Sequence, residues 1–216
     1  MTSQKRRRLT AFAAVVLATA MSSLTAFAGD SSARHAGAKA TVVTDLWFEL
    51  VGQFQNSGPG VTPETHIHYG YLAWIKGVSA YAAPPRNETN ARFTFFADGR
   101  TSPVIVNGPL RAASRTGTLA LYDNRSTNGD WTKPDTFRDG TPILRASYRH
   151  EPVTSTLTGA VNLFSEDTIT FTRPFETSHG LVQLGKVGET FIERYTGQSN
   201  MPGPPSGYFI GYAVSR

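Results

Sequence analysis

The chain of 216 residues contains no cysteine. This absence excludes disulfide bonds, cysteine nucleophiles, thiolate metal ligands and thiol redox pairs. The fold must therefore be stabilised by a buried core, without a covalent cross-link that restricts the unfolded chain. A segment of roughly 175 residues, the length left after the N-terminal segment, is long enough to bury such a core in one domain.

The N-terminal segment has the pattern of a secretory signal peptide. Basic residues 5–8 precede an apolar stretch from Leu9 to Phe27, and a small-residue cleavage pattern, Ala26-Phe27-Ala28, ends it. We therefore predict a signal peptide over residues 1–28 that is cleaved near Ala28, a flexible leader over 29–40, and a secreted, extracellular all-β domain over 41–216. The Arg6-Arg7 pair leaves both the general secretory and the twin-arginine route open.

The chain after the signal peptide has almost no net charge. The whole sequence has 21 basic and 16 acidic residues, and the signal peptide removes four basic and no acidic ones, which leaves 17 against 16. Nucleic-acid binders keep a basic surface, so nucleic acid is not a favoured partner. No later stretch is apolar enough to span a bilayer, so no membrane span is expected after signal removal. The remaining arginines are scattered singly among acids, for example at Arg86, Arg92, Arg100, Arg111 and Arg115.

No segment shows a helical period, and a period of two residues dominates instead. Residues 46–54 alternate an apolar set with a mixed set, and residues 66–78 carry apolar or aromatic side chains on both faces. A strand that is apolar on both faces is typical of a closed or two-layered sheet. About nine or ten short strands predict an all-β fold, namely a single-domain antiparallel β-barrel or a closed β-sandwich of about 8–10 strands.

Turn-forming residues divide these strands. Asp98-Gly99 lies between two apolar runs and predicts a hairpin, because glycine readily adopts the positive φ of such turns. Asn107-Gly108-Pro109 ends the next strand. Ser165-Glu166-Asp167 is interpreted as the turn of a second hairpin. A long polar loop over 123–140 carries Trp131 and Phe137, and is expected to be functional or packed down by its own aromatics.

The segment from Thr65 to Ile75 holds the strongest candidate site. Alternate residues of a strand point the same way, so His66 and His68 can present two imidazoles to one divalent metal ion. A glycine, five residues and His-x-His, from Gly60 to His68, resembles the first half of the first cupin motif. The resemblance covers about nine residues and implies a double-stranded β-helical barrel that often binds a metal. Where the motif has a glutamate, this chain has Leu72 and Ala73.

The second cupin motif is matched less well. Pro174 to His179 keeps its proline-to-histidine spacing, but Glu176 replaces a glycine. His66 and His68 are therefore left with an open third ligand, either His179 or His150. The alternative interpretation is that both histidines are polar residues at the end of a sheet.

Other catalytic motifs are absent. No G-x-S-x-G nucleophile elbow, dinucleotide-binding glycine loop or P-loop occurs. The acids, among them Glu166, Asp167 and Glu193, are scattered and are interpreted mainly as solvated surface. Catalytic residues and the question of enzymatic activity are left open.

Aromatic residues remain the last signal, and they indicate either a packed core or the wall of an apolar pocket. In size, export and strand number the chain resembles the secreted lipocalin-like barrels and the allene-oxide-cyclase and dirigent barrels, a resemblance of architecture alone. Our first hypothesis is a barrel that binds a small apolar or aromatic ligand, with Tyr69, Tyr71, Trp74 and Arg145 as its wall and polar anchor. The alternatives are a cupin-like metal-dependent enzyme using His66 and His68, and a structural or adhesive cell-surface protein. No cofactor is predicted besides this possible divalent metal.

Overall fold

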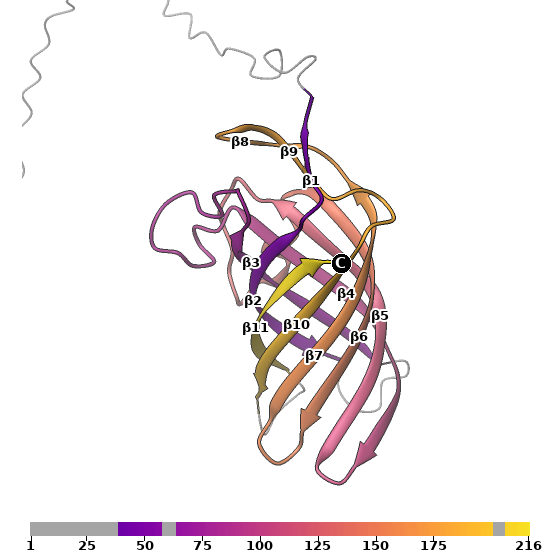
Figure 1. Cartoon of the computed structure of the whole chain (residues 1–216). Helices are drawn as coiled ribbons and strands as arrows, with labels where there is room; N and C mark the ends of the chain where they lie inside the picture. The colour runs from indigo at the N-terminus through magenta and orange to yellow at the C-terminus, as the bar shows by residue number, and fades with distance from the viewer. Residues whose placement is uncertain (1–38, 58–63, 201–205) are drawn as a thin grey trace, which may run out of the picture. The chain divides into compact units, whose positions relative to one another are not determined.

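The computed structural model describes residues 39–57, 64–200 and 206–216 (Figure 1). The predicted signal peptide and residues 29–38 of the predicted leader lie outside these residues. The Gly60 that begins the cupin-like spacing lies outside them as well. Within the described residues, no helix is long and apolar enough to cross a membrane.

Eight antiparallel strands form a closed barrel, which confirms the prediction of an all-β barrel. Apart from the strands, a short 3-10 helix, η2 (Pro134–Phe137), lies in the loop between β5 and β6. The barrel strands, in chain order, are β2 (Trp47–Asn56), β3 (Thr65–Ile75), β4 (Phe93–Asn107), β5 (Leu110–Asp123), β6 (Thr141–Ser155), β7 (Ala160–Thr172), β10 (Thr190–Ser199) and β11 (Ser206–Ser215).

Each barrel strand pairs with the strands that come before and after it in the barrel sequence, and β11 pairs with β2 to close the sheet. Closure removes the two exposed edges that an open sheet would present to other chains. This up-and-down order differs from the double-stranded β-helix that the cupin resemblance implies. In the up-and-down barrel consecutive barrel strands pair directly with each other, across the tight turns after β4 and β6 and across the longer connections alike.

One insertion interrupts this order. Between β7 and β10 the chain forms β8 (Phe175–Thr177) and β9 (Gly180–Leu184), and β9 also pairs in parallel with β1 (Thr41–Val43). The three strands form a small sheet at one end of the barrel, and the hairpin turns β4–β5 and β6–β7 lie at the opposite end (Figure 1). We call the latter the mouth end.

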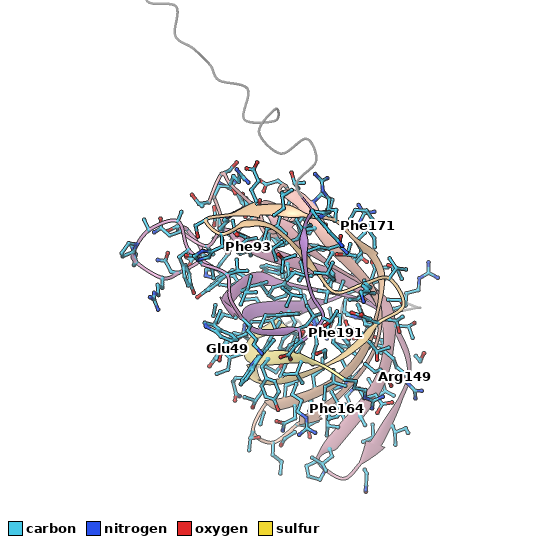
Figure 2. The ribbon with its side chains drawn as sticks, turned by 45° about the horizontal axis from the view of Figure 1, so that its top comes forward. Glu49, Phe93, Arg149, Phe164, Phe171 and Phe191 are labelled. Atoms are coloured by element: carbon cyan, nitrogen blue, oxygen red, sulfur yellow. The ribbon has the colours of Figure 1, made fainter. Side chains whose placement is uncertain are left out.

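The two-residue period places one set of side chains inside the barrel and the other outside. Phe93 and Phe191 are fully buried within it, whereas Phe164 and Arg149 are on its exposed surface (Figure 2). Phe48 packs edge-on against Phe191, with ring centroids 5.8 Å apart. We call the apolar part of the interior the set formed by Phe48, Leu50, Leu72, Phe93, Phe95, Leu121, Leu144, Ile169 and Phe191.

A second, smaller core lies on the outside of the barrel. The loop between β5 and β6 folds over the outer face of β3, where Phe137 and Trp131 contact Tyr69 with ring centroids 5.4 and 6.2 Å away. The aromatics of the loop therefore pack it down, one of the two outcomes expected from its length. They also account for the apolar character of both faces of β3.

Two predicted hairpins are wrong. Asp98-Gly99 lies inside β4, and Ser165-Glu166-Asp167 lies inside β7, so both strands run on through the supposed turns. In each case polar or small residues point into the barrel, where the local sequence looks like a turn. The actual reversal after β4 is at Gly108-Pro109, between the paired Asn107 and Leu110, and Gly108 has a φ of 56°.

Candidate functional site

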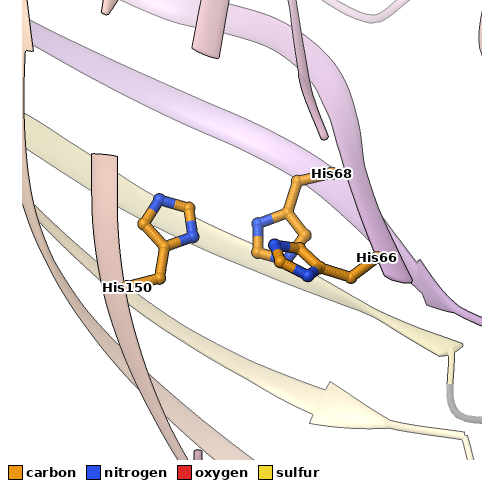
Figure 3. Close-up of side chains that lie close together, drawn as sticks. All are labelled: His66, His68 and His150. Atoms are coloured by element: carbon orange, nitrogen blue, oxygen red, sulfur yellow. The ribbon is translucent and has the colours of Figure 1, made fainter. Parts of the chain in front are cut away.

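Three histidines meet inside the barrel. His66 and His68 come from β3 and His150 comes from β6, and their imidazoles face one another (Figure 3). One ring nitrogen from each lies within 4.8 Å of those of the other two. All three side chains are almost fully buried, at 1–3% exposed. A set of three inward histidines at this spacing can share one metal ion.

The strand register explains how Tyr148 supports this cluster. His66 pairs with Gly99, Gly99 with Gly117, and Gly117 with Tyr148, so that four neighbouring strands form one row. The two glycines leave the space through which the Tyr148 side chain reaches across the row, since a Cβ at either would collide with its hydroxyl. The Tyr148 hydroxyl and His66 Nε2 then share a hydrogen bond of 2.7 Å.

Most of the imidazole nitrogens form no hydrogen bond with a described residue. Both nitrogens of His68 and of His150, and Nδ1 of His66, are buried without a hydrogen bond among the described residues. Buried polar atoms are nearly always hydrogen-bonded, so several orphaned nitrogens facing one another need a physical explanation. A ligand or ion that accepts their lone pairs provides one.

The environment keeps the three imidazoles neutral. Burial, and to a smaller extent the Arg115 charge, lowers the pKa of His66 to about 3. Burial and the neighbouring histidines also lower the pKa of His68 and His150 well below the ordinary value. Neutral imidazole is the form that coordinates a metal, so these side chains need not lose a proton before binding.

Two acids lie beside the histidines. Asp167 from β7 and Glu193 from β10 are fully buried, and each has a carboxylate oxygen within 4.8 Å of a ring nitrogen of His150 and of the other acid. The Ser165 hydroxyl donates a hydrogen bond to Asp167, and the Tyr195 hydroxyl donates one to Glu193. Burial raises the pKa of both carboxyl groups, to about 7 for Asp167. Without a compensating cation the pair therefore tends to keep protons.

A cavity of about 170 Å³ connects this interior with the mouth end. His68 and Tyr195 form its inner wall, and Arg115 lies at its side. The cavity reaches the cluster at His68. We call the interior groups of this region the polar part: His66, His68, Arg115, Tyr148, His150, Ser165, Asp167, Glu193 and Tyr195.

Comparison of the chain with family models, curated proteins and solved structures finds no match. The function must therefore be argued from the geometry alone.

The structure brings together some predicted site residues and separates others. His66 and His68 converge as the sequence predicts, and His150 joins them. The other candidate third ligand, His179, lies exposed in the turn between β8 and β9.

The predicted ligand wall lies elsewhere. Tyr69 and Tyr71 point to the outer face of β3 and contact Trp131 of the covering loop. Trp74 is 40% exposed, and Arg145 is exposed on the outside of β6 with its guanidinium 5.6 Å from the Phe171 ring. None of the four is among the residues that line the mouth cavity.

Several residues of the polar part were not predicted as site residues. Tyr148 alternates in β6 with the exposed Arg145 and Arg149, on the buried and more apolar face that it shares with His150, the residue already expected as a candidate third ligand. Asp167 follows Leu163 and Ser165 at intervals of two, and Glu193 stands between Phe191 and Tyr195 in the same way. The two-residue period continues through these polar residues. Extending the predicted strands across them would have identified Tyr148, Asp167 and Glu193 as inward-facing.

Proposed function

We propose that the protein is a metal-dependent enzyme. In this proposal it binds a divalent metal ion through His66, His68 and His150, and the ion takes part in catalysis. The observation that carries the proposal is the convergence of three buried imidazoles whose nitrogens largely lack hydrogen-bond partners. Three protein ligands are typical of catalytic metal sites, which keep a further position for water or substrate. A bound ion of this kind supplies Lewis acidity or an activated water.

The partners of the histidines support this proposal. If His66 Nε2 carries the proton and donates it to the Tyr148 hydroxyl, Nδ1 keeps its lone pair for a metal. Metal-binding histidines commonly use their second nitrogen in this way, and the bond fixes the orientation of the ring. Tyr148 is then a positioning residue for His66.

The neighbouring acids support it through charge. An ion bound by three neutral imidazoles keeps its full positive charge inside the barrel, where an unpaired charge is expensive. Asp167 and Glu193 lie next to His150 and can become negative when that charge arrives. The set of three histidines and two acids is therefore balanced for a divalent cation.

The test is metal binding by the purified protein and its variants. We expect elemental analysis and titration with Co²⁺ or Zn²⁺ to give about one ion per chain, as a single three-histidine site requires. His68→Ala and His150→Ala should each abolish stoichiometric binding. His179→Ala is the matched control, since it removes an exposed histidine, and it should bind like the wild type.

The outcome that would refute the proposal is a folded wild-type protein that binds no ion at micromolar concentrations, or one whose binding survives both interior substitutions. Circular dichroism of each variant shows whether the β-barrel is retained. A cobalt absorption spectrum adds a direct readout, because its visible bands report the coordination of the ion.

A second candidate function is the binding of a small ligand in the barrel, as the sequence first suggested. The mouth cavity favours it, because part of its wall is apolar and consists of Phe54, Val161, Leu163 and Phe209. The ligand would occupy the mouth end only, since the large side chains of the apolar part fill the other end. Saturable quenching of tryptophan fluorescence by aromatic compounds would support it, and a flat response across a panel would argue against it.

A further inference from the structure

Arg115 is a buried arginine without a carboxylate partner among the described residues. It comes from the inner face of β5, pairs in register with His150, and is only 8% exposed. Its Nε has no partner, and within residues 39–57, 64–200 and 206–216 no hydrogen bond or ion pair joins its guanidinium to another side chain. Arg92, by contrast, donates two hydrogen bonds of 2.7 and 2.8 Å to the two oxygens of Asp123.

The nearby charges do not neutralise Arg115. Glu64 is the acid that influences it most, but this carboxylate also lies 3.5 Å from the guanidinium of Arg111, so two cations share one anion. Arginine remains protonated in proteins even when buried. An enclosed guanidinium without its own anion is costly, which indicates that a negative group is missing from this part of the barrel.

The space beside Arg115 has the size and lining for such a group. The mouth cavity, of about 170 Å³, combines the two arginines with an apolar wall that includes Phe54, Leu163 and Phe209. A cavity of roughly 150 Å³ can hold one benzene ring. Oδ1 of Asn56 and Oγ1 of Thr101 are also buried without a hydrogen-bond partner among the described residues, and both residues line the same cavity.

We propose that the mouth cavity binds a small organic carboxylate, whose two oxygens pair with Arg115 and whose apolar body lies against Phe54 and Phe209. A guanidinium presents two parallel N–H groups that match a carboxylate in a bidentate pair. His68 lines the same cavity, so the bound molecule is placed next to the three histidines. The carboxylate is a substrate only if the protein is the metal enzyme proposed above, so its role as substrate rests on that proposed function. Binding of the carboxylate depends on Arg115 alone.

The test compares benzoate with benzamide, its neutral isostere. Binding to the full-length protein is measured by calorimetry after metal removal with a chelator, so that no carboxylate–metal bond can contribute. We expect benzoate to bind at least about tenfold more tightly than benzamide, as a charge-assisted bidentate pair requires. Benzoate should also shift the NMR signals of His68 and Tyr195, which line the cavity.

Variants locate the effect. Arg115→Met should reduce the preference for benzoate to about twofold or less, whereas Arg145→Met, an exposed arginine on the outside of β6, should leave it unchanged. Equal affinity for benzoate and benzamide in the wild type overturns the inference, and this comparison holds even if Arg115→Met does not fold. A preference that persists in folded Arg115→Met, or that leaves His68 and Tyr195 undisturbed, overturns it too.

The two proposals fail separately. A protein that binds Co²⁺ but does not distinguish benzoate from benzamide keeps the metal site and loses the carboxylate site. A protein that prefers benzoate but binds no Co²⁺ keeps an anion-binding cavity and loses the proposed metal function.

Discussion

The apolar and polar parts of the interior are built on the same strands but follow different rules. In the apolar part, Phe48 and Phe191 pack as rings in van der Waals contact, and no polar atom needs a partner. In the polar part, His68, His150 and Arg115 are buried too, yet they have nitrogens without a hydrogen-bond partner among the described residues. A barrel of this size can fill its interior with side chains. The polar part therefore departs from the packing that would be most stable, and such departures are typical of functional sites.

The largest effect should come from the apolar part. Phe191→Ala removes a fully buried ring and should lower the free energy of unfolding by about 3–5 kcal/mol, the range typical of such cavities. Urea unfolding followed by circular dichroism measures the loss. Below the transition, the variant should still bind cobalt like the wild type. If it loses the ion while folded, the two parts are coupled and the comparison fails.

The next prediction concerns the pH dependence of stability, which the polar part should cause and the apolar part should not. The pKa of Asp167 is raised by burial from 3.8 in a free side chain to about 7 in the folded protein. Between these pH values the folded protein keeps a proton on Asp167 that the unfolded chain has released. The contribution of this proton to stability is therefore complete below about pH 4 and is lost as the pH rises through 7. Each unit of pKa difference corresponds to about 1.4 kcal/mol.

Asp167→Asn removes this titration and retains an oxygen that can accept the Ser165 hydroxyl. In the presence of a chelator we expect the stability of the variant relative to the wild type to increase from pH 5 to pH 8. The increase should be on the order of a few kcal/mol. Urea unfolding at both pH values measures it. A constant difference between the two proteins would show that Asp167 does not titrate in this window. Phe191→Ala serves as the pH-independent reference.

Tyr148→Phe should act on function more than on folding. It removes the hydroxyl that bonds His66 Nε2 and keeps the ring that stacks on His150 at 3.6 Å. Loss of such a partner typically weakens metal binding by about 10–100-fold. Competition titration with a coloured chelator measures the change in cobalt affinity. Unchanged affinity would remove Tyr148 from the site and leave His66 as a ligand without a positioning residue.

The smallest effects should come from the outside of the barrel. Arg145→Met changes an exposed side chain and should shift the free energy of unfolding by about 0.5 kcal/mol or less. Trp74→Ala also removes the edge-on ring contact with Trp47 at 5.6 Å, so it should cost about 0.5–1.5 kcal/mol. Neither should change cobalt or benzoate binding more than about twofold, since neither residue lines the mouth cavity. Calorimetry on both variants tests this. A large loss in either would return the ligand site to the residues first chosen from the sequence.

The sequence predicted the barrel well because its evidence is local. Alternation of apolar residues in 46–54 and 143–150, with turn residues between strands, is enough to place most of the strands. The pair His66 and His68 is also a local pattern, since both lie on one face of one strand. What joins them to His150 is the register of β3, β4, β5 and β6, which a single sequence does not specify.

The errors have one physical source. Polar or small residues in a strand usually mark a turn, and Gly99 and Asp167 were interpreted in that way. In this barrel Gly99 makes room for the Tyr148 hydroxyl, and Asp167 reaches into the polar part. A separate error placed Arg145 at the ligand, because charge alone does not reveal which face of a strand is enclosed.

The pairing of β11 with β2 has a consequence for how the protein reaches its native state. Val214 lies opposite Trp47, so the last barrel strand must find a partner synthesised about 170 residues earlier. Loop-closure entropy makes such distant pairing late and slow. Until then β3 and β6 belong to an open, curved sheet, and the imidazoles are still accessible to solvent. An ion that enters at this stage would be enclosed when the final strand docks, so metal availability during folding, and not only afterwards, would determine how much of the protein becomes loaded.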